Sequence, residues 1–182
     1  MSYPVFREYE ASMYDPQNII TLKVGTDTLA GGYCVQANAV AGTYLDGYGA
    51  VYTPAQVSNI NATDVVLVDT NALYYHDVLG NRLDIDDPTV KAAYTGDLVR
   101  AIRPTRNKHY FMSNDIVASG TIAAGSYLIP TANSYLWTVT TDITTGTPKY
   151  VFLIEEINVK DTFVGLSAIT GMRVRCVRDS SI

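Results

Sequence analysis

The chain has 182 residues, a net charge of −5 and a pI near 4.8. This acidity argues against a general nucleic-acid binder, which needs a basic surface to displace the counterions of the phosphate backbone. No apolar run approaches the roughly 18–20 residues that span a bilayer. The N-terminal segment carries Arg7, Glu8 and Glu10 where a secretory signal has an apolar stretch. We therefore expect a chain that folds in a cytoplasm and binds neither nucleic acid nor membranes.

The chain is a series of short runs rich in Thr, Val, Ile and Tyr, separated by Gly, Asn and Asp. Ile19–Val24 alternates as a half-buried strand does, and the apolar run between Asp64 and Asp69 is typical of a strand buried on both faces. Short helical turns are expected only over residues 54–60 and 88–94, after prolines. The pattern predicts an all-β fold, an antiparallel barrel or sandwich with at most two short helices. The expected strands are 19–24, 33–37, 64–69, 98–103, 127–129, 135–140, 150–154 and 172–177.

Two segments of the chain are similar to each other. Thr28–Val35 (TLAGGYCV) and Thr121–Leu128 (TIAAGSYL) each read as a turn followed by a strand. Gly32 and Gly125 stand at the matching position, where a tight turn requires positive φ. The repeat indicates a β domain over residues 19–182 with two related halves, about 19–105 and 106–182; chance similarity between turn segments is the alternative. Residues 1–18 lack alternation and are interpreted as an extended N-terminal arm.

Catalytic signatures are missing from the sequence. His76 and His109 have no metal-ligand spacing, and no nucleophile elbow, phosphate loop or dinucleotide motif is present. Cys34 and Cys176 lie in apolar runs, which favours buried, reduced thiols. We expect no enzymatic activity, no cofactor and no essential metal.

Charged residues gather in two places. The acidic segment 77–87, which includes Asp84 and Asp86, could ligate Ca²⁺ through its carboxylates, or it could be an exposed acidic loop. Arg173 and Arg175 alternate with apolar residues, so they would line one face of a strand. They would pair with Glu155 or Glu156 on a neighbouring strand, or would meet an acidic partner. Glu155 and Glu156 themselves should point to opposite faces unless a bulge intervenes.

One region carries a family resemblance. Thr95–Pro104 (TGDLVRAIRP) is followed by Tyr110–Met112 and by Asp115–Pro130 (DIVASGTIAAGSYLIP). This region resembles the capsid decoration proteins (cement, or auxiliary head, proteins) of tailed bacteriophages, which carry a strand of G-D-x-V-R type and a glycine turn before a strand. The resemblance implies a β-barrel or β-tulip-like domain on the outer surface of the virion, made in the cytoplasm of the host bacterium. There it would bridge subunits of the major capsid protein and stabilise the shell.

The N-terminal arm is the candidate contact segment. Tyr3, Phe6, Tyr9 and Tyr14 are expected to anchor it on a neighbouring subunit or on the capsid, since tyrosine is over-represented among interface hot spots. The alternative is that Tyr9 and Tyr14 pack back onto their own domain. A homo-oligomer is expected, because weak contacts become strong when several engage at once.

A second functional reading remains open. The chain could be a carbohydrate- or receptor-binding β-module of a phage tail or head fibre. Tyrosines and Trp137 would then stack on sugar rings, with the acidic segment holding Ca²⁺. Several aromatic side chains on one exposed face would distinguish this function from capsid decoration.

Overall fold

The computed structural model describes residues 4–8, 19–45, 49–70, 75–76, 82–83, 92–161 and 168–179. Within these ranges the regular elements are β-strands and one 3₁₀ turn, η4 (Asn114–Ile116). The all-β prediction is therefore confirmed. The two helical turns that the sequence suggested are wrong where the structure describes them: Pro54 lies inside a strand, and Ala92–Ala93 form the short strand β9.

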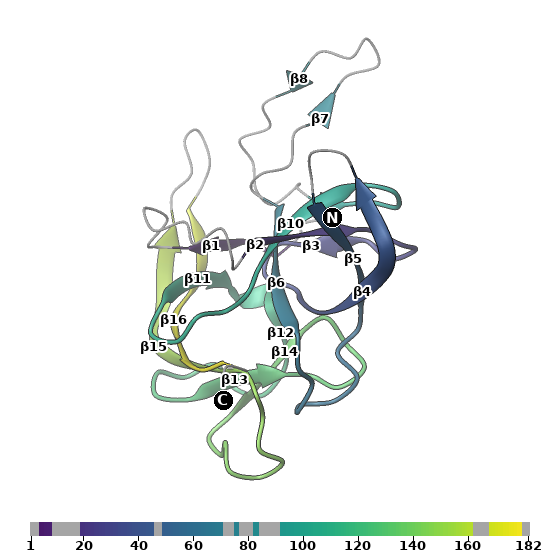
Figure 1. Ribbon diagram of the computed structural model, residues 1–182. Helices are drawn as coiled ribbons and strands as arrows, with labels where there is room; N and C mark the ends of the chain where they lie inside the picture. The colour runs from purple at the N-terminus through teal and green to yellow at the C-terminus, as the bar shows by residue number, and fades with distance from the viewer. Residues whose placement is uncertain are drawn as a thin grey trace.

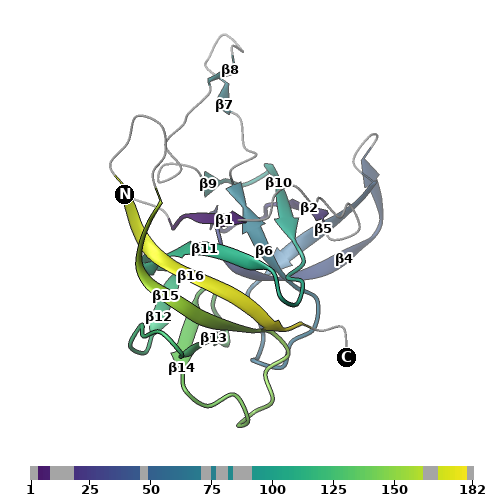
Figure 2. The ribbon, with the colours of Figure 1, turned by 90° about the vertical axis from the view of Figure 1, so that its left-hand side faces the viewer.

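Five strands form a closed barrel in the order β10-β2-β5-β4-β6 (Figures 1 and 2). Their bounds are β2 (Ile19–Lys23), β4 (Cys34–Leu45), β5 (Gly49–Ala55), β6 (Val65–Asp69) and β10 (Leu98–Ile102). The pairs are antiparallel except for β2 with β5, which is parallel. The sequence predicted antiparallel pairing throughout, and the parallel pair is a difference. It arises because β5 pairs antiparallel with β4 on one side and lies beside β2 on the other, which closes the barrel.

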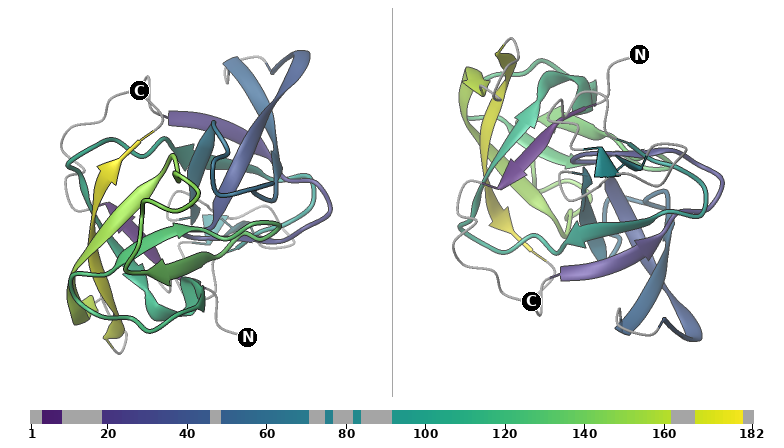
Figure 3. Two further views of the ribbon diagram at one scale, coloured as in Figure 1. Left: turned by 90° about the horizontal axis from the view of Figure 1, so that it is seen from below. Right: turned by 90° about the horizontal axis from the view of Figure 1, so that it is seen from above.

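A seven-stranded curved sheet, in the order β1-β11-β16-β15-β13-β14-β12, makes up the second part of the molecule (Figure 3). The β12–β14 pair is also parallel. Two further pairs stand outside these sheets, β3 (Leu29–Ala30) with β9 and β7 (Tyr75–His76) with β8 (Arg82–Leu83). The strands of the large sheet are β1 (Phe6–Glu8), β11 (His109–Ser113), β12 (Val117–Ser119), β13 (Tyr127–Pro130), β14 (Trp137–Thr140), β15 (Val151–Asp161) and β16 (Ile169–Arg178).

Strand β6 belongs to two hydrophobic cores at once. Val66 and Val68 pack inside the barrel, whereas Val65 and Leu67 pack into the core under the large sheet. All five residues of the strand are buried, as the continuous apolar run predicted. Both cores therefore depend on this barrel strand, whose two faces are covered by different parts of the molecule.

Among the described residues the turn-then-strand unit occurs four times, twice more than the sequence similarity indicated. In each copy the fourth residue's N–H donates to the first residue's carbonyl at 2.9–3.3 Å, the third residue has positive φ, and a strand starts directly afterwards. The third residues and their φ values are Gly32 (77°), Gly96 (91°), Asn107 (70°) and Gly125 (86°). The turns are Ala30–Tyr33, Tyr94–Asp97, Thr105–Lys108 and Ala123–Ser126, which precede β4, β10, β11 and β13.

Each turn docks on another segment through the same reciprocal pair of hydrogen bonds. At Gly32 the backbone N–H donates to the carbonyl of Val68 (2.8 Å), and the Val68 N–H donates back to the carbonyl of Tyr33 (3.0 Å). The other copies dock in the same way on Val24, Cys176 and Ile154. Two copies introduce barrel strands and two introduce strands of the large sheet, so the same local device starts strands in both parts.

The N-terminal strand belongs to the domain. β1 pairs antiparallel with β11, with Phe6 opposite Met112. Phe6 is 2% exposed and stacks on Tyr110 with ring centroids 5.5 Å apart. This corrects the expectation for Phe6, because its ring fills the core of its own chain and is not presented to a partner. The other three proposed anchors, Tyr3, Tyr9 and Tyr14, lie outside the described residues.

Candidate functional site

The thiols of the chain are unsuited to nucleophilic chemistry. Cys34 and Cys176 are free and buried, as the sequence predicted. Burial raises the pKa of the Cys34 thiol well above its usual range, and it raises the pKa of Cys176 to about 12. Both therefore remain protonated near neutral pH, where only a thiolate is an effective nucleophile.

The described ranges contain no group of three or more His, Cys, Asp or Glu side chains that could hold a metal ion. The acidic segment proposed for Ca²⁺ falls mostly outside them, including Asp84 and Asp86. No helix among the described residues has the length and hydropathy needed to cross a membrane.

The outer face of the large sheet carries a network of ion pairs centred on Glu155. Arg175 Nε donates to Glu155 Oε1 at 2.7 Å. Glu155 Oε2 lies 3.3 Å from His109 Nε2 and 3.6 Å from Arg173 Nε. These side chains come from β11, β16 and β15, which are neighbours in the sheet. The Arg175 hydrogen bond, helped by the charges of His109, Arg175 and Arg173, holds the pKa of Glu155 below its usual range despite partial burial.

A β-bulge explains why both glutamates contribute to this network. The pairing of β15 with β16 shifts register between Ile154 and Glu156, and a bulge redirects side chains locally. Glu156 Oε1 therefore reaches Arg173 NH2 at 3.0 Å, while Glu155 also contacts Arg173. The bulge is the exception under which the two glutamates need not point to opposite faces. The expected pairing of the arginines with them is confirmed.

Cations are concentrated around this network. Segment 103–108 lies against segment 173–178, because the turn Thr105–Lys108 docks on Cys176. Together the two segments hold six of the chain's 13 Lys and Arg residues, whereas Glu155, Glu156 and Asp179 are the adjoining acids. We call this surface the basic face; it consists of His109, Arg173 and Arg175, which contact Glu155, together with Arg106 and Lys108 of the docked turn. A chain with a net charge of −5 thus gathers several cations beside Glu155.

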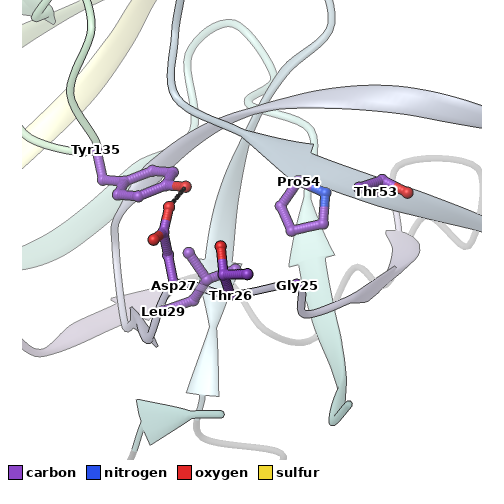
Figure 4. Close-up of a pocket in the computed structure, with 7 residues that line it drawn as sticks. All are labelled: Gly25, Thr26, Asp27, Leu29, Thr53, Pro54 and Tyr135. Atoms are coloured by element: carbon purple, nitrogen blue, oxygen red, sulfur yellow. Dashed lines mark hydrogen bonds between the residues drawn. The ribbon is translucent and has the colours of Figure 1, made fainter. Parts of the chain in front are cut away.

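A small pocket lies at the barrel (Figure 4). Its volume is about 250 Å³. The loop after β2, strand β5 and the residue Tyr135 before β14 form its walls. Tyr135 donates its hydroxyl to Asp27 Oδ2 at 2.7 Å, and its ring stacks on Tyr33 with centroids 5.8 Å apart. The lining residues are Gly25, Thr26, Asp27, Leu29, Thr53, Pro54 and Tyr135.

Tyr135 is held as a neutral phenol. Burial, followed by the hydrogen bond and the charge of Asp27, raises the pKa of its hydroxyl well above the usual range. Sequence analysis did not find this pocket, because Asp27 and Tyr135 are 108 residues apart and meet only through the tertiary fold. The abundance of tyrosine was the one signal that pointed toward it.

Trp137 does not have the role that the carbohydrate-binding alternative gave it. The indole is fully buried, donates through Nε1 to the carbonyl of Gly32 at 3.1 Å, and packs edge-on against Phe152. It therefore has no exposed ring face on which a sugar could stack.

No protein-family model matches this chain, and no curated protein matches it.

Proposed function

We propose that this chain is a structural virion protein that binds the outside of a phage capsid and stabilises the shell by bridging subunits of the major capsid protein. The sequence of residues 95–130, which resembles capsid decoration proteins, gives the proposal its starting point. The all-β architecture agrees with what that resemblance implies.

The observation that carries the proposal is the basic face. Its side chains are partly ordered before any partner arrives, because Glu155 holds Arg175 and contacts His109 and Arg173. A preorganised surface loses less side-chain entropy on binding. Arg173 and Arg175 remain 40% and 32% exposed, so their guanidinium groups are accessible to acceptors on a partner. The chemistry that fits is an acidic protein surface.

Oligomerisation of this chain would strengthen a contact with the capsid that is weak for a single subunit. Exposed charge pairs typically contribute 0.2–1 kcal/mol each; one basic face would therefore bind weakly. A homo-oligomer that engages several capsid subunits at once would gain avidity without any new kind of contact. Complementary charge would also accelerate encounter and make binding sensitive to salt.

The test is co-sedimentation with heads assembled from the major capsid protein encoded in the same genome. The wild-type chain should pellet with the heads, and raising the salt concentration should weaken binding. The double variant R106E/R175Q should bind about tenfold more weakly or worse, a loss of roughly 1.4 kcal/mol. K160E is the matched control, since Lys160 lies near the other end of β15. Failure to bind heads at low salt would refute the proposal, as would an equal loss with K160E.

A further inference from the structure

In the pocket at the barrel, Tyr33 and Tyr135 hold the carboxylate of Asp27 in a fixed orientation. The capsid-binding proposal does not involve these residues. Tyr135 stacks nearly parallel on Tyr33, with 4° between the ring planes, so the phenol is held in place. Its hydroxyl fixes Asp27 by a 2.7 Å hydrogen bond to Oδ2. Among the described residues no other side chain donates a hydrogen bond to this carboxylate, and Asp27 is an exposed residue of the pocket lining, so Oδ1 is an accessible acceptor. The carboxylate is oriented before a ligand arrives.

The rest of the lining limits the chemistry of a ligand. The described lining residues include no Lys or Arg, and Asp27 is negative, so anions are disfavoured. Thr26 and Thr53 add hydroxyl groups that can both donate and accept, while Pro54 adds apolar surface. A ligand that carries hydroxyl groups on a small apolar skeleton would complement such a lining. The volume of about 250 Å³ is below the roughly 300–1,000 Å³ of pockets for drug-sized ligands, which suits a ligand of one ring.

We propose that this pocket binds a single neutral pyranose unit, such as the terminal sugar of a surface glycan. Asp27 Oδ1 accepts hydrogen bonds from ring hydroxyls, and Thr26 and Thr53 complete the polar contacts. The CH groups of the sugar lie against Pro54. The pocket shares no residue with the basic face, so a capsid-bound protein could carry this site without loss of its capsid contact.

Gly25 gives a direct way to close the pocket. It lines the pocket, has no positive φ, and a Cβ added there would meet no atom within 4 Å. A leucine at this position should therefore fill space that the ligand needs while leaving the fold intact. D27A removes the acceptor instead, so the two variants test the same site by different means.

The experiment is an NMR titration of the full chain with the methyl glycosides of glucose, galactose, mannose and N-acetylglucosamine. At least one should bind with a dissociation constant on the order of 1 mM, about −4 kcal/mol. D27A should weaken that binding at least about tenfold, and G25L should abolish it with an unchanged melting temperature. D115N, at an exposed aspartate in η4, should bind like the wild type.

An amine probe separates the sugar from a cation held by the same carboxylate. The proposal is overturned if n-butylamine binds in an Asp27-dependent way while no glycoside does. It is equally overturned if no glycoside shifts the resonances of the pocket residues, or if D27A and G25L bind as tightly as the wild type. Co-sedimentation with heads is measured separately, so loss of sugar binding and loss of capsid binding can be told apart.

Discussion

The indole Nε1 of Trp137 donates a hydrogen bond to the carbonyl oxygen of Gly32 across 3.1 Å. Trp137 begins β14 of the large sheet, whereas Gly32 lies in the turn that introduces barrel strand β4. This bond therefore joins the two parts of the molecule at the point where their cores meet. It is completely buried, so its loss cannot be compensated by water.

Replacing Trp137 with Phe should destabilise the protein by about 2–4 kcal/mol, since it leaves a buried carbonyl unpaired and a space where the larger ring was. Urea unfolding followed by far-UV circular dichroism measures the change. The loss should appear in one transition for the whole chain, because β6 serves both cores. Two separate transitions would contradict the shared-core description.

The two glycine turns found in the sequence should respond differently to alanine. At Gly32 a Cβ would stand 2.7 Å from Ile116 Cδ1 and 3.1 Å from Phe6 Cβ, in addition to the strain of positive φ. At Gly125 it would meet no atom within 4 Å, so only the backbone strain of about 1–2 kcal/mol remains.

We therefore expect G32A to lower the free energy of unfolding by at least about 1–3 kcal/mol more than G125A, the usual cost of overpacking a core. Thermal melts of both variants beside the wild type provide the comparison. Equal losses would mean that the contacts around Gly32 relax without cost.

The sequence predicted the elements that depend on local chemistry. The strand at β6 was recognisable from its apolar run, and two docked turns from their glycines. The copy at Thr105–Lys108 was missed because Asn107 takes the place of glycine, although asparagine also tolerates positive φ. In the copy at Tyr94–Asp97, the glycine was noticed only as part of the family resemblance.

Features that arise from tertiary packing could not be predicted in this way. The parallel pairing of β2 with β5 follows from closing the barrel, and β1 reaches the sheet edge by pairing with a strand about 100 residues later. The basic face could be predicted in part, because Arg173 and Arg175 were expected to pair with Glu155 across neighbouring strands. His109 joined it only through the pairing of β11 with β16.

The native protein should resist thiol reagents. Both thiols are buried, and the pKa of each is raised, that of Cys176 to about 12. Labelling with Ellman's reagent near neutral pH should be slow until denaturant is added, after which both cysteines react. Rapid labelling of one thiol in the folded protein would show that its segment opens readily.

The stability contributed by Glu155 should depend on pH in a defined direction. Its pKa in the folded protein lies below the ordinary value of 4.5, so its stabilising effect is fully present above that pH. The effect is lost as the pH falls through the lower pKa of the folded state. E155Q should therefore cost roughly 1.5–3 kcal/mol near neutral pH, the range for hydrogen bonds to charged groups, and progressively less in acid.

E156Q is the matched control for this prediction. Glu156 is 53% exposed and, among the described residues, forms an ion pair only with Arg173, so its replacement should cost at most about 0.2–1 kcal/mol. Melting temperatures of the wild type and both variants across the acid range give the pH dependence of each difference. If E155Q is as destabilising in strong acid as at neutral pH, packing and not the charge of Glu155 is responsible for its effect. If E156Q matches E155Q throughout, then Glu155 is not the centre of the ion-pair network on the basic face.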